Sequence, residues 1–406
     1  MEVVNGIQDD LGNPDLYQQG DPEHYWQYLR NNDPVYWNPP GYCAGFWSIT
    51  RYDDACQIFR DTENFTSEKG IMLGVNEDGG DTGGGKILSV SDPPWHDKLR
   101  KALAGGFTPR AMRLLKDDIE TTAVTLVERA LELGSCDFVA EISSRYPNYI
   151  ICSLLGVPRD DWELMYELTT AAMGFDDPDV RMHDSAKIAR GRAHAEIIGY
   201  YMDLMDERRD NPGTDLISML TGALIDGRPL TDKEIILNCD SFIIGGNETT
   251  RNAISGGIEM LAQDSSQWDL LRADEALVST TADEILRWTT PIMHSLRTAK
   301  NDVKLHDNLI KRDDPVAIWT ISANRDENVF DAPEKFNVTR SPNKHIAFAV
   351  GTHHCIGSRL TQLEIETLLR ILRAKVKSIS LEGPAKRSRS NVIRGIKQLP
   401  VSLTAK

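Results

Sequence analysis

One cysteine of this sequence lies in surroundings that could make its sulfur reactive. Cys355 is flanked by Gly351 and Gly357, and apolar residues at helical spacing begin at Leu360. The pattern predicts a tight turn that leads into the N-terminus of a helix, where backbone N–H groups and the helix dipole favour a thiolate. A thiolate in such a turn could ligate iron, bind zinc or act as a nucleophile.

The remaining cysteines and histidines bear on these alternatives. A zinc site needs further Cys or His ligands at suitable spacing, and none of the other cysteines lies near a histidine in a recognised zinc pattern. A cysteine hydrolase needs a distant base and an oxyanion hole, which this segment alone does not exclude. A structural thiol beside a His-His pair is the plainest interpretation. We expect reduced thiols at Cys43, Cys56, Cys136, Cys152, Cys239 and Cys355.

A second polar pair lies inside a segment of helical spacing. Thr231 and Glu234 read as a capping box that opens this helix, and Gly245-Gly246 precede Glu248-Thr249. Two adjacent glycines inside a helix cost about 1 kcal/mol each relative to alanine, so we expect another group to approach the backbone closely. Thr249 can also donate a hydrogen bond to the carbonyl group of Gly245, four residues earlier.

The segment from Phe348 to Gly357 resembles the haem-binding loop of the cytochrome P-450 superfamily, in its pattern Phe-x-x-Gly-x-His-x-Cys-x-Gly. The resemblance implies that Cys355 is the axial thiolate ligand of the haem iron, and so the metal ligand. It also implies that His353 hydrogen-bonds a haem propionate. The family usually has Gly or Ser where this chain has Ala349, and we expect a slightly tighter loop with no loss of haem.

Other segments match the same family in the family's order. Glu248 and Thr249 resemble the acid–alcohol pair that organises water and delivers protons during oxygen activation, and they are the implied catalytic residues. The stretch 92–100 resembles the start of a helix whose His and Arg clamp the propionates, and Arg297 matches a further propionate partner. The cofactor-binding residues that the resemblance implies are His96, Arg100, Gly246, Arg297, Phe348, His353, Cys355 and Gly357.

Two further matches concern the framework. Glu284 and Arg287 resemble the family's Glu-x-x-Arg pair, which binds a later arginine matched by Arg340, and we interpret this triad as structural. The stretch 389–400 resembles the C-terminal hairpin of bacterial members that oxidise steroids, lipids and terpenoids. The resemblance covers residues 20–405 approximately.

Composition and periodicity agree with a large helical protein. The chain has 406 residues and a formal net charge of −16, which argues against nucleic acid as a main partner. The resemblance implies a mainly α fold with small β-sheets (α+β), the single triangular-prism cytochrome P-450 fold, over residues 1–406. Apolar spacing predicts helices at 110–133, 159–172, 184–209 and 231–262, and strands at 45–50, 316–321 and within 392–403.

A long stretch without periodicity, 67–90, contains the glycine-rich run 79–85 followed by Lys86. A phosphate loop would need Ser or Thr after the lysine, and Ile87 stands there instead. We therefore interpret 67–90 as a mobile loop that covers a ligand site.

The resemblance implies a bacterial haem-thiolate monooxygenase with haem b (heme b, iron protoporphyrin IX), which hydroxylates a C–H bond of a hydrophobic small molecule with O2. Terpenoid, steroid or lipid, and polyketide substrates of secondary metabolism stay open, as do ring coupling, epoxidation and a non-catalytic haem sensor. No apolar N-terminal stretch marks the chain for export, so we expect a cytoplasmic protein without a membrane anchor. We also expect a monomer. Predicted substrate contacts are 71–90, 243–246, 291–296 and Ile393.

Electrons must come from outside, because the sequence contains no flavin or nicotinamide fingerprint. We expect a ferredoxin and a ferredoxin reductase as partners. Basic residues could form a docking face for them, with scattered solvated charges as the equal alternative. These residues are Lys98, Lys101, Arg110, Arg113 and Arg359.

Overall fold

The structure, a computed structural model, describes residues 9–18, 20, 22–74, 81, 83–172 and 184–406, and most of them are helical. The prediction of a mainly α fold with small sheets is confirmed. The helices are α1 Asp15–Gln18, α2 Glu23–Asn32, α3 Tyr52–Arg60, α4 Trp95–Leu103, α5 Pro109–Leu133, α6 Arg145–Leu155, α7 Trp162–Ala172, α9 Asp184–Asp210, α10 Leu216–Thr221, α11 Asp232–Gln263, α12 Ser265–Ala273, α13 Leu277–Thr289, α14 Thr320–Ala323 and α15 Ser358–Lys375.

The strands form one mixed sheet and four smaller antiparallel ones. The mixed sheet has the order β1-β2-β10-β7-β3, in which only β2 and β10 run parallel. A second sheet has the order β11-β14-β4. The strands are β1 Val35–Asn38, β2 Phe46–Ile49, β3 Phe65–Thr66, β4 Ser135–Asp137, β5 Leu224–Ile225, β6 Arg228–Pro229, β7 Ser295–Ala299, β8 Val303–Leu305, β9 Asn308–Ile310, β10 Pro315–Ile318, β11 Val376–Leu381, β12 Lys386–Arg387, β13 Ile396–Gln398 and β14 Pro400–Ala405.

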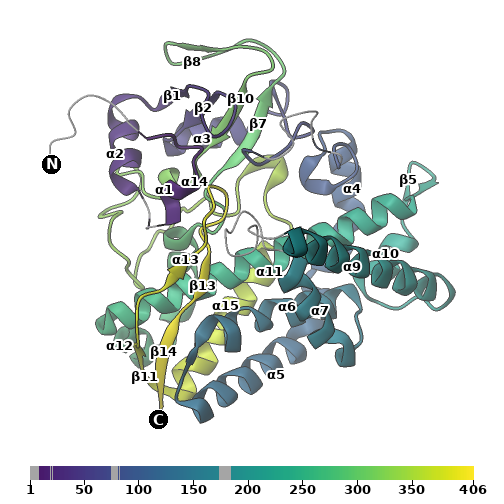
Figure 1. Cartoon of the computed structure of the whole chain (residues 1–406), viewed down its shortest axis with the longest axis vertical. Coiled ribbons are helices and arrows are strands. Elements are labelled where there is room, and N and C mark those ends of the chain that lie inside the picture. Colours follow the sequence, from purple (N-terminus) through teal and green to yellow (C-terminus); the bar gives the residue numbers. More distant parts are fainter. Residues whose placement is uncertain (1–8, 19, 21, 75–80, 82, 173–183) are drawn as a thin grey trace.

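Helix α11 runs through the middle of the molecule, with the mixed sheet and α1–α3 on one side and α5, α6 and α15 on the other (Figure 1). The predicted capping box is present, because Thr231 Oγ1 accepts from Glu234 N and the Glu234 carboxylate accepts from Thr231 N. This satisfies two of the N–H groups that a helix start leaves unpaired. The helix runs to Gln263, one residue past the predicted end.

Glycines let neighbouring helices approach α11 closely. A Cβ atom added at Gly246 would lie 2.9 Å from Ile151 Cδ1 of α6. Added at Gly256 and Gly257, it would lie 2.7 Å from Thr289 Cγ2 and 2.6 Å from Ile285 Cδ1, both of α13. At contacts this short a neighbouring side chain would have to shift to admit a Cβ atom, so these glycines allow the close spacing of the helices around α11.

The strand predicted at 316–321 is wrong in its second half. Strand β10 ends at Ile318, and the N–H groups of Ser322 and Ala323 both donate to the carbonyl of Trp319. The apolar run continues because this turn, α14, is also buried. The helix predicted at 159–172 begins with a 3-10 turn, so α7 starts at Trp162. The segment 392–403, predicted to contain a strand, contains β13 and the first part of β14. It also contains Ile393, whose backbone forms an isolated bridge with Ile292.

Candidate active site

The loop that carries Cys355 has the predicted turn-to-helix geometry. Cys355 N–H donates to Phe348 O at 2.9 Å, and α15 begins at Ser358 with Gly357 as its N-cap. Gly351 has φ +77°, and an added Cβ there would lie 3.1 Å from Phe59 O of α3. Only glycine fits such a position without strain, so this residue fixes the approach of the loop to α3.

The Cys355 thiol is accessible yet surrounded by protein. The side chain is exposed, while burial of its charged form raises the pKa of Cys355. Hydrogen bonds from the backbone of Gly357 and Ser358 and the charge of Arg100 lower that pKa, as the helix-start argument predicted. Because burial outweighs them, the protein alone favours the thiol, and bonding to a metal cation is what would remove this proton.

Four cationic or basic side chains meet beside this loop. The rings of His96 on α4 and His353 have centroids 4.3 Å apart. His96 and Arg297 are 1% and 6% exposed. Burial lowers the pKa of Arg297 to about 10, against the charge of Asp92. Burial and then the charges of Arg297, His96 and Arg100 lower the pKa of His353 to about 3. The structure thus brings together the propionate-binding residues that the resemblance implied.

Two carboxylates lie near this cluster, Asp92 and Asp97, but neither forms an ion pair with its arginines. Among the residues that the structure describes, neither Arg100 nor Arg297 forms an ion pair, and the polar contact of Arg297 is Nη1 to Leu296 O at 2.7 Å. His96 Nδ1 lies 3.0 Å from the exposed Asp97, and His353 Nε2 lies 3.3 Å from Ser67 Oγ. A buried unpaired cation is costly, so the cluster fits an anionic ligand such as the two carboxylates of haem b.

The acid and the alcohol of α11 make separate contacts. Thr249 Oγ1 donates to Gly245 O at 2.7 Å, as predicted. Glu248 is 9% exposed, and its Oε1 accepts from Arg251 Nη2 at 2.5 Å and from Asn252 Nδ2 at 2.9 Å. Sequence reasoning did not select Arg251 and Asn252, although their spacing of three and four residues from the acid is the spacing of helix neighbours.

The two glycines before this pair differ in their surroundings. A Cβ added at Gly245 would meet nothing within 4 Å, whereas one at Gly246 would meet Ile151 of α6. The close approach expected at the glycine pair is therefore made by a helix at Gly246. Gly245 is the residue with open space beside it, and the assignment of Gly246 to the cofactor stays a prediction.

A histidine joins the segments predicted to contact substrate. His294 Nε2 accepts from Leu73 N at 3.1 Å, so its Nδ1–H donates to Asn391 O at 3.0 Å. Leu296 N–H donates to Ile71 O at 2.8 Å. Burial lowers the pKa of His294 to about 4, although the bond to Asn391 opposes this. Sequence reasoning included His294 only within the predicted substrate contacts 291–296 and did not predict this link, and residues 75–80 and 82 of the predicted loop lie outside the described part.

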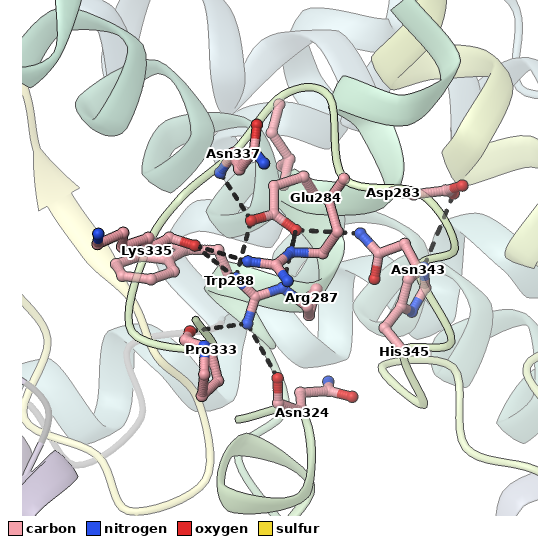
Figure 2. Close-up of polar contacts among 12 residues, drawn as sticks. Asp283, Glu284, Arg287, Trp288, Asn324, Pro333, Lys335, Asn337, Asn343 and His345 are labelled. Atoms are coloured by element: carbon pink, nitrogen blue, oxygen red, sulfur yellow. Dashed lines mark hydrogen bonds and ion pairs between the residues drawn. The ribbon is translucent and has the colours of Figure 1, made fainter. Parts of the chain in front are cut away.

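The predicted structural triad is present. Arg287 Nε and Nη2 each donate to the Glu284 carboxylate at 2.8 Å, and Arg340 Nε donates to it at 3.0 Å. Figure 2 shows Glu284 and Arg287 pointing toward one another, with the carbonyl groups of Asn324, Pro333 and Lys335 around the guanidinium. The side chains of Glu284 and Arg287 are fully buried, so this network fastens α13 to the segment that precedes the Cys355 loop.

The other predictions concern metals, membranes and the basic face. In the described ranges, no group of three or more His, Cys, Asp or Glu side chains is arranged to hold a metal ion. No helix in those ranges is long and apolar enough to cross a membrane. Lys98 pairs with Asp226 at 2.5 Å. The other four basic residues are exposed and form no ion pair with a described residue: Lys101, Arg110, Arg113 and Arg359.

Comparisons with known proteins agree with this geometry. A family model described as Cytochrome P450 matches residues 17–374. The chain is 37% identical to "Cytochrome P450 NovI" of Streptomyces niveus, over 97% of this chain and 96% of that one. It is 36% identical to "Linalool 8-monooxygenase" of Pseudomonas putida, over 98% and 99%. The crystal structure of P450 OxyD, "involved in the Biosynthesis of Vancomycin-type Antibiotics", aligns with TM-score 0.89 and 36% identity, over 98% of this chain and 100% of that one.

Proposed function

Since this chain belongs to the cytochrome P450 family and is a haem-dependent monooxygenase, we propose that it hydroxylates a C–H bond of a terpenoid, steroid or polyketide-type molecule. Its cofactor is haem b. The observation that carries the proposal is an exposed cysteine beside two arginines that form no ion pair with described residues, one of which, Arg297, is buried. When bound through a thiolate, the haem supplies the activation of O2 and the cleavage of its O–O bond.

The chain's own residues divide the work of binding the cofactor. Cys355 would give its thiolate to the iron, and Arg297, Arg100 and His96 would pair with the propionates. His353, which is held neutral by its surroundings, would donate or accept a single hydrogen bond. Gly357, whose added Cβ would be 3.9 Å from Cys355 Sγ, leaves the sulfur open on that side.

Proton handling would fall to Glu248 and Thr249. Reduction of O2 consumes protons in surroundings that exclude bulk water, so a positioned acid and a hydroxyl are needed. The Thr249 hydroxyl donates its hydrogen bond to Gly245 O at 2.7 Å, so its oxygen can accept a hydrogen bond from a donor such as water. Replacement of Thr249 by Ala should lower the product formed per O2 consumed, because proton delivery is impaired.

Apolar groups would select the substrate. Ile243 and Met293 are buried, and the backbone bridge between Ile292 and Ile393 joins two of the predicted contact segments. Relatives carry the names "Linalool 8-monooxygenase" and "Steroid C26-monooxygenase". A terpenoid or steroid skeleton is mostly hydrocarbon, so desolvation by such a lining would supply most of its binding energy.

The test of the substrate class is a spectral titration. Hydrophobic compounds of the three classes are added to the haem-loaded protein, and shifts of the Soret band identify those that bind near the iron. Compounds that bind are then incubated with O2 and an electron source, and a product heavier by one oxygen atom supports hydroxylation. Binding with no O2 uptake would instead support the haem sensor, and a dehydrogenated or coupled product would support the ring-coupling alternative.

Electrons would arrive from an acidic ferredoxin at a basic face. Arg113 and Arg359 are exposed and free of ion pairs with described residues, so both can approach an acidic partner. Replacement of both by Gln should slow reduction by an acidic ferredoxin severalfold at low salt and leave the rate at high salt nearly unchanged. The control is Arg312, an exposed residue of the β9–β10 turn. If Arg312→Gln slows reduction at low salt as much, the ferredoxin does not dock specifically at the face of Arg113 and Arg359.

A further inference from the structure

The carboxyl group of Glu248 is held at one oxygen by its two helix neighbours. Oε1 accepts from Arg251 Nη2 at 2.5 Å and from Asn252 Nδ2 at 2.9 Å, and Asn252 Nδ2 also donates to Glu248 O at 2.8 Å. Within the part of the chain that the structure describes, Oε2 accepts no hydrogen bond. The contacts of Arg251 and Asn252 with Oε1 therefore leave Oε2 as the oxygen that can exchange protons with solvent.

Arg251 has little else to bind. Its side chain is 18% exposed, its ion pair is with Glu248, and its Nε is buried without a hydrogen-bond partner. Burying a guanidinium with one donor unsatisfied costs free energy, which its pairing with the carboxylate must offset. The site is therefore a poor one for an arginine without the Glu248 carboxylate beside it.

Asn252 connects the acid to another element. Its Oδ1 accepts from Ile396 N of β13 at 2.9 Å, while its Nδ2 holds Glu248. Ile396 lies three residues after Ile393, and the backbone of Ile393 forms a bridge with Ile292 in the segment predicted to contact substrate. One side-chain amide therefore lies between the acid and the strand that leaves the predicted substrate region.

We propose that Arg251 and Asn252 are positioning residues for Glu248. Arg251 supplies the charge that keeps the carboxylate turned toward the following helical turn, with Oε2 free, and Asn252 fixes this arrangement against β13. The proposal rests on the proposed proton-handling role of Glu248 and Thr249. Neither positioning residue needs to touch the substrate or the haem for this role.

Turnover of the haem-loaded protein tests the positioning role. Arg251→Gln and Asn252→Ala should each lower kcat and the product formed per O2 consumed about tenfold, with KM unchanged and a larger solvent isotope effect on kcat. Arg251→Lys keeps the charge and should recover most of the loss. Arg251→Gln with the product yield and isotope effect of the wild type would overturn the proposal.

A matched control separates positioning from attachment of the hairpin. Arg387 Nη2 of β12 contacts both oxygens of Glu259 on α11, at 2.8 and 2.9 Å. Glu259→Gln weakens this second link between α11 and the β12–β13 hairpin without touching Glu248. Its product yield should equal that of the wild type, and a loss as large as that of Asn252→Ala would overturn the specific role of Asn252.

A double-mutant cycle of unfolding measurements tests the contact between Glu248 and Arg251 without turnover. Urea midpoints are measured for wild type, Arg251→Gln, Glu248→Gln and the double variant, all haem-loaded. Arg251→Gln alone leaves the buried Glu248 carboxylate without its ion pair. The urea midpoint of the double variant should therefore fall by less than the sum of the falls in the two single variants. Additive midpoints overturn the proposal. A wild type that oxidises no compound refutes the proposed function instead, and this cycle still decides the contact between Glu248 and Arg251.

Discussion

The imidazole rings of His96 and His353 lie with their centroids 4.3 Å apart, although the two residues are 257 positions apart in the chain. One comes from the first turn of α4 and the other from the loop just before Cys355. Arg297 of β7 contributes its charge to the same place, because it lowers the pKa of His353. Three elements distant in sequence therefore build one cluster of basic side chains beside the candidate iron ligand.

Removal of the Arg297 charge from this cluster should weaken retention of haem. Arg297→Gln deletes a charge that forms no ion pair with described residues and that we assign to a propionate. A hydrogen bond to a charged group contributes about 1.5–3 kcal/mol, so haem affinity should fall roughly tenfold to a hundredfold. The measurement is the rate of haem transfer to a scavenger protein.

Arg325 provides a control for loss of a buried arginine. It is also buried, and it pairs with Glu23 rather than with the cluster. Arg325→Gln should destabilise the protein yet leave the rate of haem transfer from folded protein near that of the wild type. Equal rates of haem loss in the two variants would contradict the assignment of Arg297 to a propionate.

The sequence allowed prediction of those parts of the site that lie within short motifs. The capping box of α11 and the bond from Thr249 to Gly245 join residues within four positions of one another, and the turn before α15 closes between Phe348 and Cys355, still within one short motif. Local hydrogen bonding and helix geometry suffice to predict such contacts.

Contacts between distant segments could not be predicted in this way. Asn252 accepts from Ile396, 144 residues later, and His294 joins Leu73 to Asn391. These pairings follow from how the elements pack, which apolar periodicity does not specify. The neighbour of Gly246 was missed for the same reason, because Ile151 belongs to another helix.

Ala349 has a left-handed backbone in the Cys355 loop, with φ +55°. An L-residue with a Cβ pays about 1–2 kcal/mol in this conformation, while glycine costs about 0.4–1 kcal/mol more entropy on folding. Ala349→Gly should therefore raise the free energy of unfolding by about 0.5–1 kcal/mol. The neighbouring Ala347 packs on the core without positive φ, so Ala347→Gly should lower it, and a stabilisation there would contradict the argument from φ.

Loss of the Glu284 charge should prevent accumulation of folded protein. Glu284→Gln leaves Arg287 and Arg340, both buried, without their shared carboxylate. Breaking a buried ion pair by removing one partner costs about 3–5 kcal/mol, which is a large part of a typical folding free energy. The measurement is the yield of soluble haem-loaded protein. Asp283→Asn removes the charge of the adjacent, partly exposed residue and should leave that yield near the wild-type level.

His294 should make the protein less stable as the pH falls. Its folded pKa is lowered to about 4 from an ordinary value of 6.5, so the unfolded chain binds more protons between those values. The free energy of unfolding is then fully retained above pH 6.5 and falls as the pH decreases toward 4, by about 3 kcal/mol for this shift. Urea unfolding of the haem-loaded protein between pH 7 and 5 measures this slope. In His294→Gln, which can still accept from Leu73 N, the slope should become shallower, and an unchanged slope would mean that other groups carry the acid sensitivity.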